Sequence, residues 1–154
     1  MVTMISEVQG NDRTDGKTMA ACSVLVVDDE KDLVETLIKR LQRRGFECEG
    51  VFSGKAALEK IRSRIFDIVL LDMKLPDMEG NSTLLEIKKI RPETQVLILT
   101  GHVSASEGLE GMKNGALDYL MKPVEFESLF ERLLKAADIA SCSHNSPVFD
   151  GRDI

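Results

Sequence analysis

The chain has 154 residues and a mass of 17.1 kDa, with 43% hydrophobic and 30% charged residues. This balance is typical of a globular domain and excludes disordered and collagen-like proteins. The formal net charge of −6 argues against nucleic acid or an anionic membrane surface as the main partner. No apolar run reaches the ~20 residues that a membrane helix needs, and the N-terminus does not resemble a signal peptide.

Three cysteines, Cys22, Cys48 and Cys142, are far apart in the sequence and form no CxxC motif. This pattern excludes a zinc ribbon and a disulfide framework. We therefore expect reduced thiols in a protein of the cytoplasm.

The two ends of the chain differ in composition from its middle. Residues 1–21 and 141–154 are polar and lack hydrophobic periodicity, so we expect flexible tails. The second tail would be a linker remnant if the chain is a piece of a longer protein. The folded domain should then cover residues 22–140.

The middle of the chain predicts five short apolar strands that alternate with five helices of three- and four-residue apolar spacing. In chain order the predicted elements are a strand at 23–27, a helix at 31–44, a strand at 46–52, a helix at 54–63, a strand at 67–71, a helix at 81–91, a strand at 95–100, a helix at 104–114, a strand at 118–121 and a helix at 125–140. The strand at 46–52 is the more polar one, which indicates a position at or near a sheet edge.

Local signals support these boundaries. Gly45 should end the first helix, and Ser53 should N-cap the second. Residues 104–107 form a capping box for the fourth helix, and Asp77 is expected to start a turn in the loop before the third. Strict alternation with right-handed crossovers predicts an α/β fold with a doubly wound five-stranded parallel sheet.

In such folds the functional site lies at the carboxyl ends of the strands. Asp28 and Asp29 follow the first strand, Asp72 follows the third, Thr100 ends the fourth, and Lys122 follows the fifth. The three carboxylates would repel one another, and one lysine cannot neutralise them alone. Hard oxygen ligands favour Mg²⁺ or Mn²⁺, and Mg²⁺ commonly brings a phosphoryl group. With that metal, Asp72 could act as a nucleophile and form an acyl phosphate.

These residues stand in four motifs: VLVVDDE at 24–30, DIVLLDMKLPDMEG at 67–80, LILTGH at 97–102 and GALDYLMKP at 115–123. The motifs resemble those of the receiver domain of bacterial two-component response regulators, over about residues 22–140. The resemblance implies the flavodoxin-like (βα)5 receiver fold with strand order 2-1-3-4-5. It also implies a phosphoacceptor that catalyses only its own phosphorylation and dephosphorylation, rather than an enzyme.

The resemblance assigns the metal site residue by residue. Asp72 would be the phosphoacceptor and also a metal ligand, and Asp29 would bind the metal directly. Asp28 would bind through water or as an alternate ligand, and the backbone carbonyl of Lys74 would complete the site. Lys74 and His102 follow Asp72 and Thr100 by two residues each, at positions that tune the phosphate lifetime in the family.

The resemblance also assigns the residues that sense the phosphoryl group. Lys122 would pair with Asp72, and Thr100 would bind a phosphoryl oxygen. Tyr119 would be an aromatic switch that turns inward, and Gly101 would leave access for the phosphoryl group. The Lys122–Pro123 peptide would be cis.

The implied partners are a sensor histidine kinase or phosphotransfer protein, and an output domain or protein contacted by the fourth helix, fifth strand and fifth helix. A homodimer formed on phosphorylation is a further possibility. Gly108 and Gly111 weaken the fourth helix, whose thin apolar face we assign to Leu109 and Met112. We interpret it as an element that rearranges on phosphorylation rather than as a poorly packed surface helix.

Two other functions share parts of this pattern. A Mg²⁺-dependent phosphohydrolase of the haloacid-dehalogenase type also uses an Asp after a strand, but it has an acid two residues on, where this chain has Lys74. An FMN-binding flavodoxin needs a Ser/Thr/Gly-rich phosphate loop after the first strand, where this chain has the acidic DDEKD. The chain is therefore interpreted as a receiver, either stand-alone or cut from a longer regulator.

Overall fold

All ten predicted elements form, and their ends shift by at most one residue. In chain order they are β1 (Ser23–Val27), α1 (Lys31–Arg43), β2 (Glu47–Val51), α2 (Gly54–Ser63), β3 (Ile68–Leu71), α3 (Gly80–Ile90), β4 (Gln95–Thr100), α4 (Ala105–Lys113), β5 (Asp118–Met121) and α5 (Phe126–Ile139). The computed structural model describes residues 22–101 and 105–140. The predictions for the two tails, for His102 and for the capping residue Ser104 lie outside this range.

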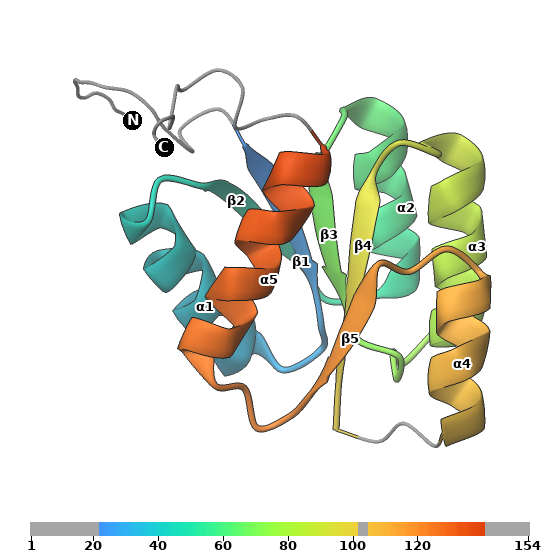
Figure 1. Ribbon diagram of the computed structural model, residues 1–154. Helices are drawn as coiled ribbons and strands as arrows, with labels where there is room; N and C mark the ends of the chain where they lie inside the picture. Colours follow the sequence, from blue (N-terminus) through green and yellow to red (C-terminus); the bar gives the residue numbers. More distant parts are fainter. Residues whose placement is uncertain (1–21, 102–104, 141–154) are drawn as a thin grey trace.

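The sheet is entirely parallel with the order β2-β1-β3-β4-β5, which confirms the predicted fold. Helices α1 and α5 cover one face, and α2, α3 and α4 cover the other (Figure 1). Val27 at the end of β1 lies opposite Leu71 at the end of β3, and Thr100 lies opposite Met121. This register brings the residues that follow these strands to one edge of the sheet.

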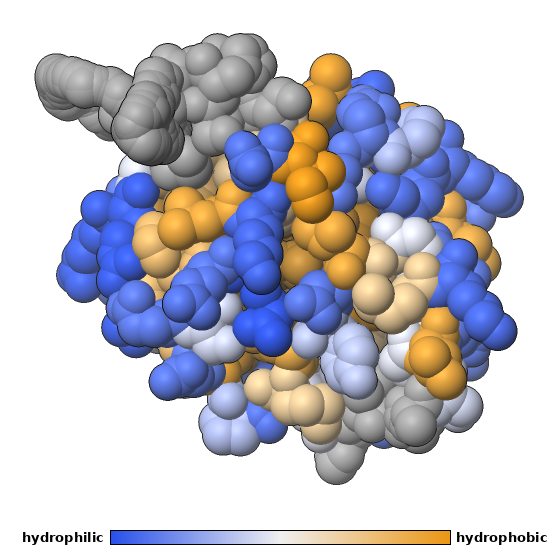
Figure 2. All heavy atoms as spheres, viewed as in Figure 1, coloured by the Kyte–Doolittle hydropathy of each residue, from blue (hydrophilic) through white to orange (hydrophobic). Residues whose placement is uncertain are grey.

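β2 lies at the predicted sheet edge, and its residues from Glu47 to Gly50 are partly exposed. Glu49 there pairs with Lys60 at 2.6 Å and with Arg64, both from the α2 region. Figure 2 shows hydrophilic residues over much of the face that carries α1 and α5, with apolar residues exposed between them. Among the described residues, no helix has the length and apolar character needed to span a bilayer.

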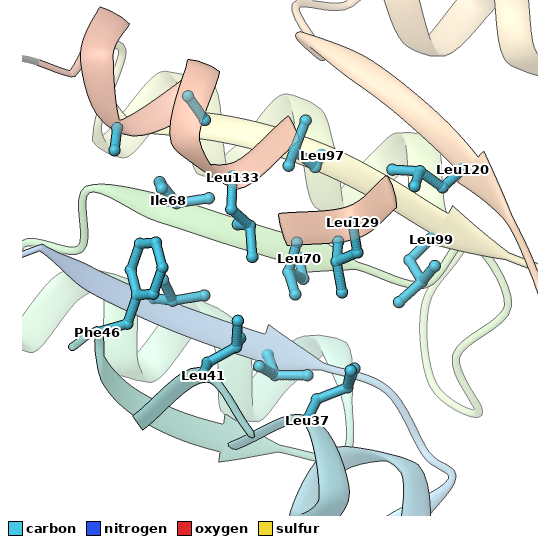
Figure 3. Packing of buried hydrophobic residues seen from close by; sticks show 14 of the residues in the cluster. Leu37, Leu41, Phe46, Ile68, Leu70, Leu97, Leu99, Leu120, Leu129 and Leu133 are labelled. Carbon is cyan, nitrogen blue, oxygen red and sulfur yellow. The ribbon is translucent and has the colours of Figure 1, made fainter. Parts of the chain in front are cut away.

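Two apolar clusters fill the space between the sheet and its helices, because alternate residues of each strand point to opposite faces. Val24 and Val26 belong to the cluster under α1 and α5, whereas Leu25 and Val27 belong to the cluster under α2 and α3. Figure 3 shows the first cluster, in which leucines of α1 and α5 meet those of β3, β4 and β5. Burial on both faces explains the near-continuous apolar runs of these strands.

The predicted helix ends have clear structural causes. Gly45 adopts φ +96°, and its N–H and that of Phe46 bond back to Gln42 and Leu41 in a Schellman motif that ends α1. The Oγ of Ser53 accepts a hydrogen bond from the Ala56 N–H at 3.1 Å, which confirms it as the N-cap of α2.

The cysteines depart from expectation at one position. Cys48 is a free, half-buried thiol whose pKa is raised to about 12 by burial and by the neighbouring Glu47 carboxylate. Cys22 is disulfide-bonded, so the prediction of three reduced thiols is wrong at this residue. Spacing along the chain does not show which cysteines meet in space.

The structure shows which face of α4 packs on the sheet. Leu109 and Met112 are 64% and 40% exposed, whereas Gly108 and Gly111 are buried. A Cβ on Gly111 would lie 2.6 Å from Cδ1 of the fully buried Ile98, so the missing side chain lets α4 approach β4. The inward face of this helix is therefore made of glycine rather than of leucine and methionine.

The two glycines of α4 should respond differently to alanine. A Cβ on Gly108 would meet the Tyr119 ring at an ordinary 3.5 Å, so Gly108→Ala should raise the free energy of unfolding by about 0.5–1 kcal/mol through helix propensity. Gly111→Ala should lower it by about 1 kcal/mol, because overpacking against Ile98 exceeds the propensity gain. Urea unfolding of both variants checks this; equal shifts of the same sign would contradict the packing assigned to Gly111.

Candidate functional site

The carboxylates predicted at the strand ends do converge. One carboxylate oxygen from each of Asp28, Asp29 and Asp72 lies within 4.8 Å of the others. Asp28 and Asp72 are buried, at 2% and 5% exposure, while Asp29 is exposed. The parallel register of β1 and β3 places them side by side, since the Asp72 N–H bonds to the Val27 carbonyl at 2.9 Å.

Asp28 and Asp72 use their two oxygens in the same way. Oδ1 of each accepts the backbone N–H two residues on, from Glu30 at 2.9 Å and from Lys74 at 3.2 Å. These local bonds fix the start of α1 and of the loop between β3 and α3. Oδ2 of each then faces the middle of the site and the side chain of Lys122.

Lys122 joins the cluster from the end of β5. Its Nζ lies 2.7 Å from Oδ2 of Asp28 and 3.5 Å from Oδ2 of Asp72, and it also pairs with Glu30. The ammonium group is therefore closer to Asp28 than to Asp72, although the resemblance implies a pair between Lys122 and Asp72. The Lys122–Pro123 peptide is cis.

The charge balance is uneven. Burial and the nearby Asp72 carboxylate raise the pKa of Asp28 above its ordinary value, and Lys122 only partly opposes this. Burial alone would lower the pKa of Lys122, but the carboxylates of Asp28, Glu30 and Asp72 outweigh it and raise that pKa. One ammonium thus serves several carboxylates, and the site retains excess negative charge.

The residues fit a hard divalent cation. Oδ2 of Asp28 is buried and has no hydrogen bond of good geometry among the described residues, although Lys122 lies 2.7 Å away. Oδ2 is therefore a ligand atom not yet saturated by the protein. Asp29 adds an exposed carboxylate, and the whole donor set consists of oxygen, as Mg²⁺ or Mn²⁺ prefers.

Thr100 and Gly101 line the same edge. Thr100 is buried at the end of β4, and its carbonyl accepts the Lys122 N–H at 2.9 Å. Gly101 is exposed, and among the described residues a Cβ there would touch the Lys122 side chain, at 3.9 Å or more. Both residues therefore lie next to Lys122.

Tyr119 and Lys74 lie at the border of the site. Tyr119 is 39% exposed and packs over Gly108 of α4, so its ring faces outward here. The Lys74 side chain is exposed. His102 lies outside the described residues.

The sequence prediction missed one acidic residue and one long-range contact. Glu30 pairs with Lys122, and its position directly after Asp28 and Asp29 could have indicated this pair. Asp77 was expected to start a turn and lies in a bend at residues 76–78, but its carboxylate also accepts the N–H groups of Gly54 and Lys55 at 2.8 and 2.9 Å. The bonds from Lys55 and Gly54 hold the pKa of Asp77 below its ordinary value. No local pattern marks such a contact, because it joins residues 22 and 23 positions apart.

The chain is similar to many known proteins. The sequence model of the response regulator receiver domain matches residues 24–134. Transcriptional regulatory protein ZraR of Escherichia coli O157:H7 is 42% identical over 113 residues, which are 73% of this chain and 26% of ZraR. The chain thus spans about a quarter of the length of that curated relative.

Solved structures show the same likeness. A CheY-like response regulator receiver domain protein from Methanospirillum hungatei matches with a TM-score of 0.76 and 32% identity, over 78% of this chain and 96% of its own. A response regulator protein from Burkholderia pseudomallei, solved with a phosphorylated aspartic acid, calcium ion and citrate, matches with a TM-score of 0.70 and 29% identity. That match covers 82% of this chain and 76% of the other.

Replacing Asp28 should stabilise the metal-free protein. Its raised pKa means that the ionised carboxylate costs free energy in the folded state. This cost is absent below the ordinary pKa of 3.8 and complete once the pH exceeds the folded-state pKa. Asp28→Asn should therefore raise the melting temperature by a few degrees at neutral pH in EDTA, with the gain vanishing below about pH 4.

Thermal unfolding followed by circular dichroism across this pH range measures the effect. Added Mg²⁺ should stabilise the wild type more than the variant, because the variant has lost a carboxylate from the metal site. A variant that is less stable than the wild type in EDTA at neutral pH would contradict the excess negative charge assigned to this site.

Proposed function

This chain belongs to the response regulator receiver family, and on that basis we propose that Asp72 accepts a phosphoryl group from the phosphohistidine of a sensor kinase or phosphotransfer protein. The observation that carries the proposal is the pairing of a buried Asp72 with Asp28, Asp29 and Lys122 at one sheet edge. Residues 22–140 would be the receiver, and residues 1–21 and 141–154 would flank it. We place its action in the cytoplasm, where kinases use ATP.

The transfer step follows from the positions of these groups. A carboxylate oxygen of Asp72 forms the new bond to phosphorus, the phosphorus–nitrogen bond of the donor breaks, and the donor histidine leaves with the electron pair. Asp28, Asp29, Asp72 and the Lys74 carbonyl would hold Mg²⁺, which supplies charge neutralisation for the phosphoryl oxygens when it is bound. Lys74 and His102 would tune how fast water later hydrolyses the acyl phosphate.

Lys122 and Thr100 would stabilise the phosphoryl group once it is in place. Lys122 already touches Asp72, and a shift of its Nζ away from Asp28 would bring it onto a phosphoryl oxygen. Thr100 lies beside it and can donate its hydroxyl. Gly101 keeps the approach open, because its nearest neighbour is the Lys122 side chain.

We propose that the output surface is formed by α4, β5 and α5. It carries exposed apolar side chains that an ordinary polar surface lacks, namely Leu109, Met112, Tyr119, Met121 and Leu134. Inward rotation of Tyr119 would remove an aromatic ring from this surface and change its fit to an output domain, a separate protein or a second copy of the chain. ZraR is named a transcriptional regulatory protein, so gene regulation is the output class that this similarity favours.

The acceptor role of Asp72 can be tested directly. Incubation with acetyl phosphate and Mg²⁺ should add the mass of one phosphoryl group, and Asp72→Asn should abolish the gain, because the amide is not a nucleophile. Intact-protein mass spectrometry measures both. Labelling that persists in the variant would refute the assignment, and steady phosphate release from a phosphomonoester would favour a phosphohydrolase instead.

The rearrangement of α4 can be followed by amide hydrogen exchange. Beryllium fluoride with Mg²⁺ mimics the phosphoryl group and should change the protection of residues 108–114 by about tenfold or more, since this helix packs through glycines. Protection within α2, whose first turn is held by Ser53 and Asp77, serves as the internal control and should stay constant. Unchanged exchange in residues 108–114 would argue against this output path.

A further inference from the structure

The acceptor loop, residues 72–80, carries both Asp72 and the Lys74 carbonyl of the proposed metal site. At its base, Lys74 and Glu79 form an antiparallel bridge, and the Gly80 N–H bonds to the Met73 carbonyl at 3.0 Å. A Cβ on Gly80 would lie 2.4 Å from Cα of Met73, so the backbones at the two ends of the loop lie too close together for any side chain at residue 80. The base of the loop is therefore well defined by the backbone.

The tip of the loop is held by a different element. Oδ1 of Asp77 accepts the Gly54 N–H at 2.8 Å, and Oδ2 accepts the Lys55 N–H at 2.9 Å. Met78 packs beside this contact, since a Cβ on Gly54 would lie 2.7 Å from its Sδ. Two neighbouring residues of the tip are thus attached to the first turn of α2.

Helix α2 has a local cap in addition to Asp77. Ser53 already caps the helix through the Ala56 N–H, and its carbonyl accepts the Ala57 N–H at 3.1 Å. The Asp77 carboxylate fills the two N–H groups that remain at this helix end, and it does so from a segment more than twenty residues away. The contact therefore fixes the loop at least as much as it fixes the helix.

We propose that Asp77 is a positioning residue of the phosphoacceptor site, which holds the acceptor loop against α2 so that the Lys74 carbonyl is set for the metal. This inference rests on the proposed function. Without the carboxylate, the tip would gain backbone freedom that metal binding must then remove. The cost should appear as weaker metal binding rather than as a loss of the nucleophile, because Asp72 keeps its own contacts.

The chain offers a matched pair of variants. Asp77→Ala and Ser53→Ala each remove side-chain acceptors from the first turn of α2, but only the first detaches the acceptor loop. Calorimetric titration with Mg²⁺ alone should give a dissociation constant raised about three- to tenfold for Asp77→Ala, within the range of outer-shell effects on metal sites. Ser53→Ala should stay within about twofold of the wild type, although its melting temperature falls.

A conservative variant and a rate measurement complete the test. Asp77→Asn keeps one oxygen acceptor, so its Mg²⁺ dissociation constant should lie between those of Asp77→Ala and the wild type. This variant also provides the test if Asp77→Ala does not fold. Labelling by acetyl phosphate should be slow in Asp77→Ala at low Mg²⁺ and should recover at saturating Mg²⁺. A general loss of stability would not produce this recovery.

The outcomes separate the two proposals. The role of Asp77 would be overturned if the wild type binds Mg²⁺ and Asp77→Ala binds it with the same affinity. It would also be overturned if Ser53→Ala loses as much affinity as Asp77→Ala. Either result would leave the proposed function intact. A wild-type chain that binds no Mg²⁺ through Asp72 would overturn the proposed function and this inference together.

Discussion

The site depends on one electrostatic constraint: buried carboxylates exceed the positive charge that faces them. Lys122 lies within 4 Å of Asp28, Glu30 and Asp72, and it cannot compensate all three. The fold therefore carries a local cost that a divalent cation and a phosphoryl group, taken together, can relieve. A site short of positive charge suits a metal ion, and burial together with the Asp72 carboxylate raises the pKa of Asp28 in this site.

The sheet imposes this constraint, and the rest of the molecule sustains it. Parallel register brings Asp28 and Asp72 side by side, and the backbone N–H groups of Glu30 and Lys74 each occupy one oxygen, so the other two must face the lysine. Such an arrangement is tolerated because two apolar clusters, one on each face of the sheet, stabilise the strands that carry it. Stability and function are thus supplied by different parts of the same strands: buried residues within them and charged residues just past their ends.

The sequence predicts what depends on local spacing, and it fails where tertiary contacts decide. Strand and helix periods, the Schellman glycine at Gly45 and the cap at Ser53 are local, and the structure agrees with each. The sequence does not show which face of α4 packs on the sheet, because hydrophobicity favours Leu109 whereas the close approach to Ile98 places Gly111 there. The contact of Asp77 could not be predicted for the same reason: its partners are Gly54 and Lys55, which no spacing rule connects to it.

The acceptor loop is attached to the first turn of α2. Toward α2 it is held by the two hydrogen bonds of Asp77 and by Met78 against Gly54. Toward α4, a side-chain hydrogen bond at 3.1 Å runs from Asn114, the residue after that helix, to Asn81 of α3. A change of charge at Asp72 must displace whichever neighbour resists least. We therefore expect α2 to act as the fixed support and α4 as the element that moves, which would direct the signal toward the α4, β5 and α5 surface.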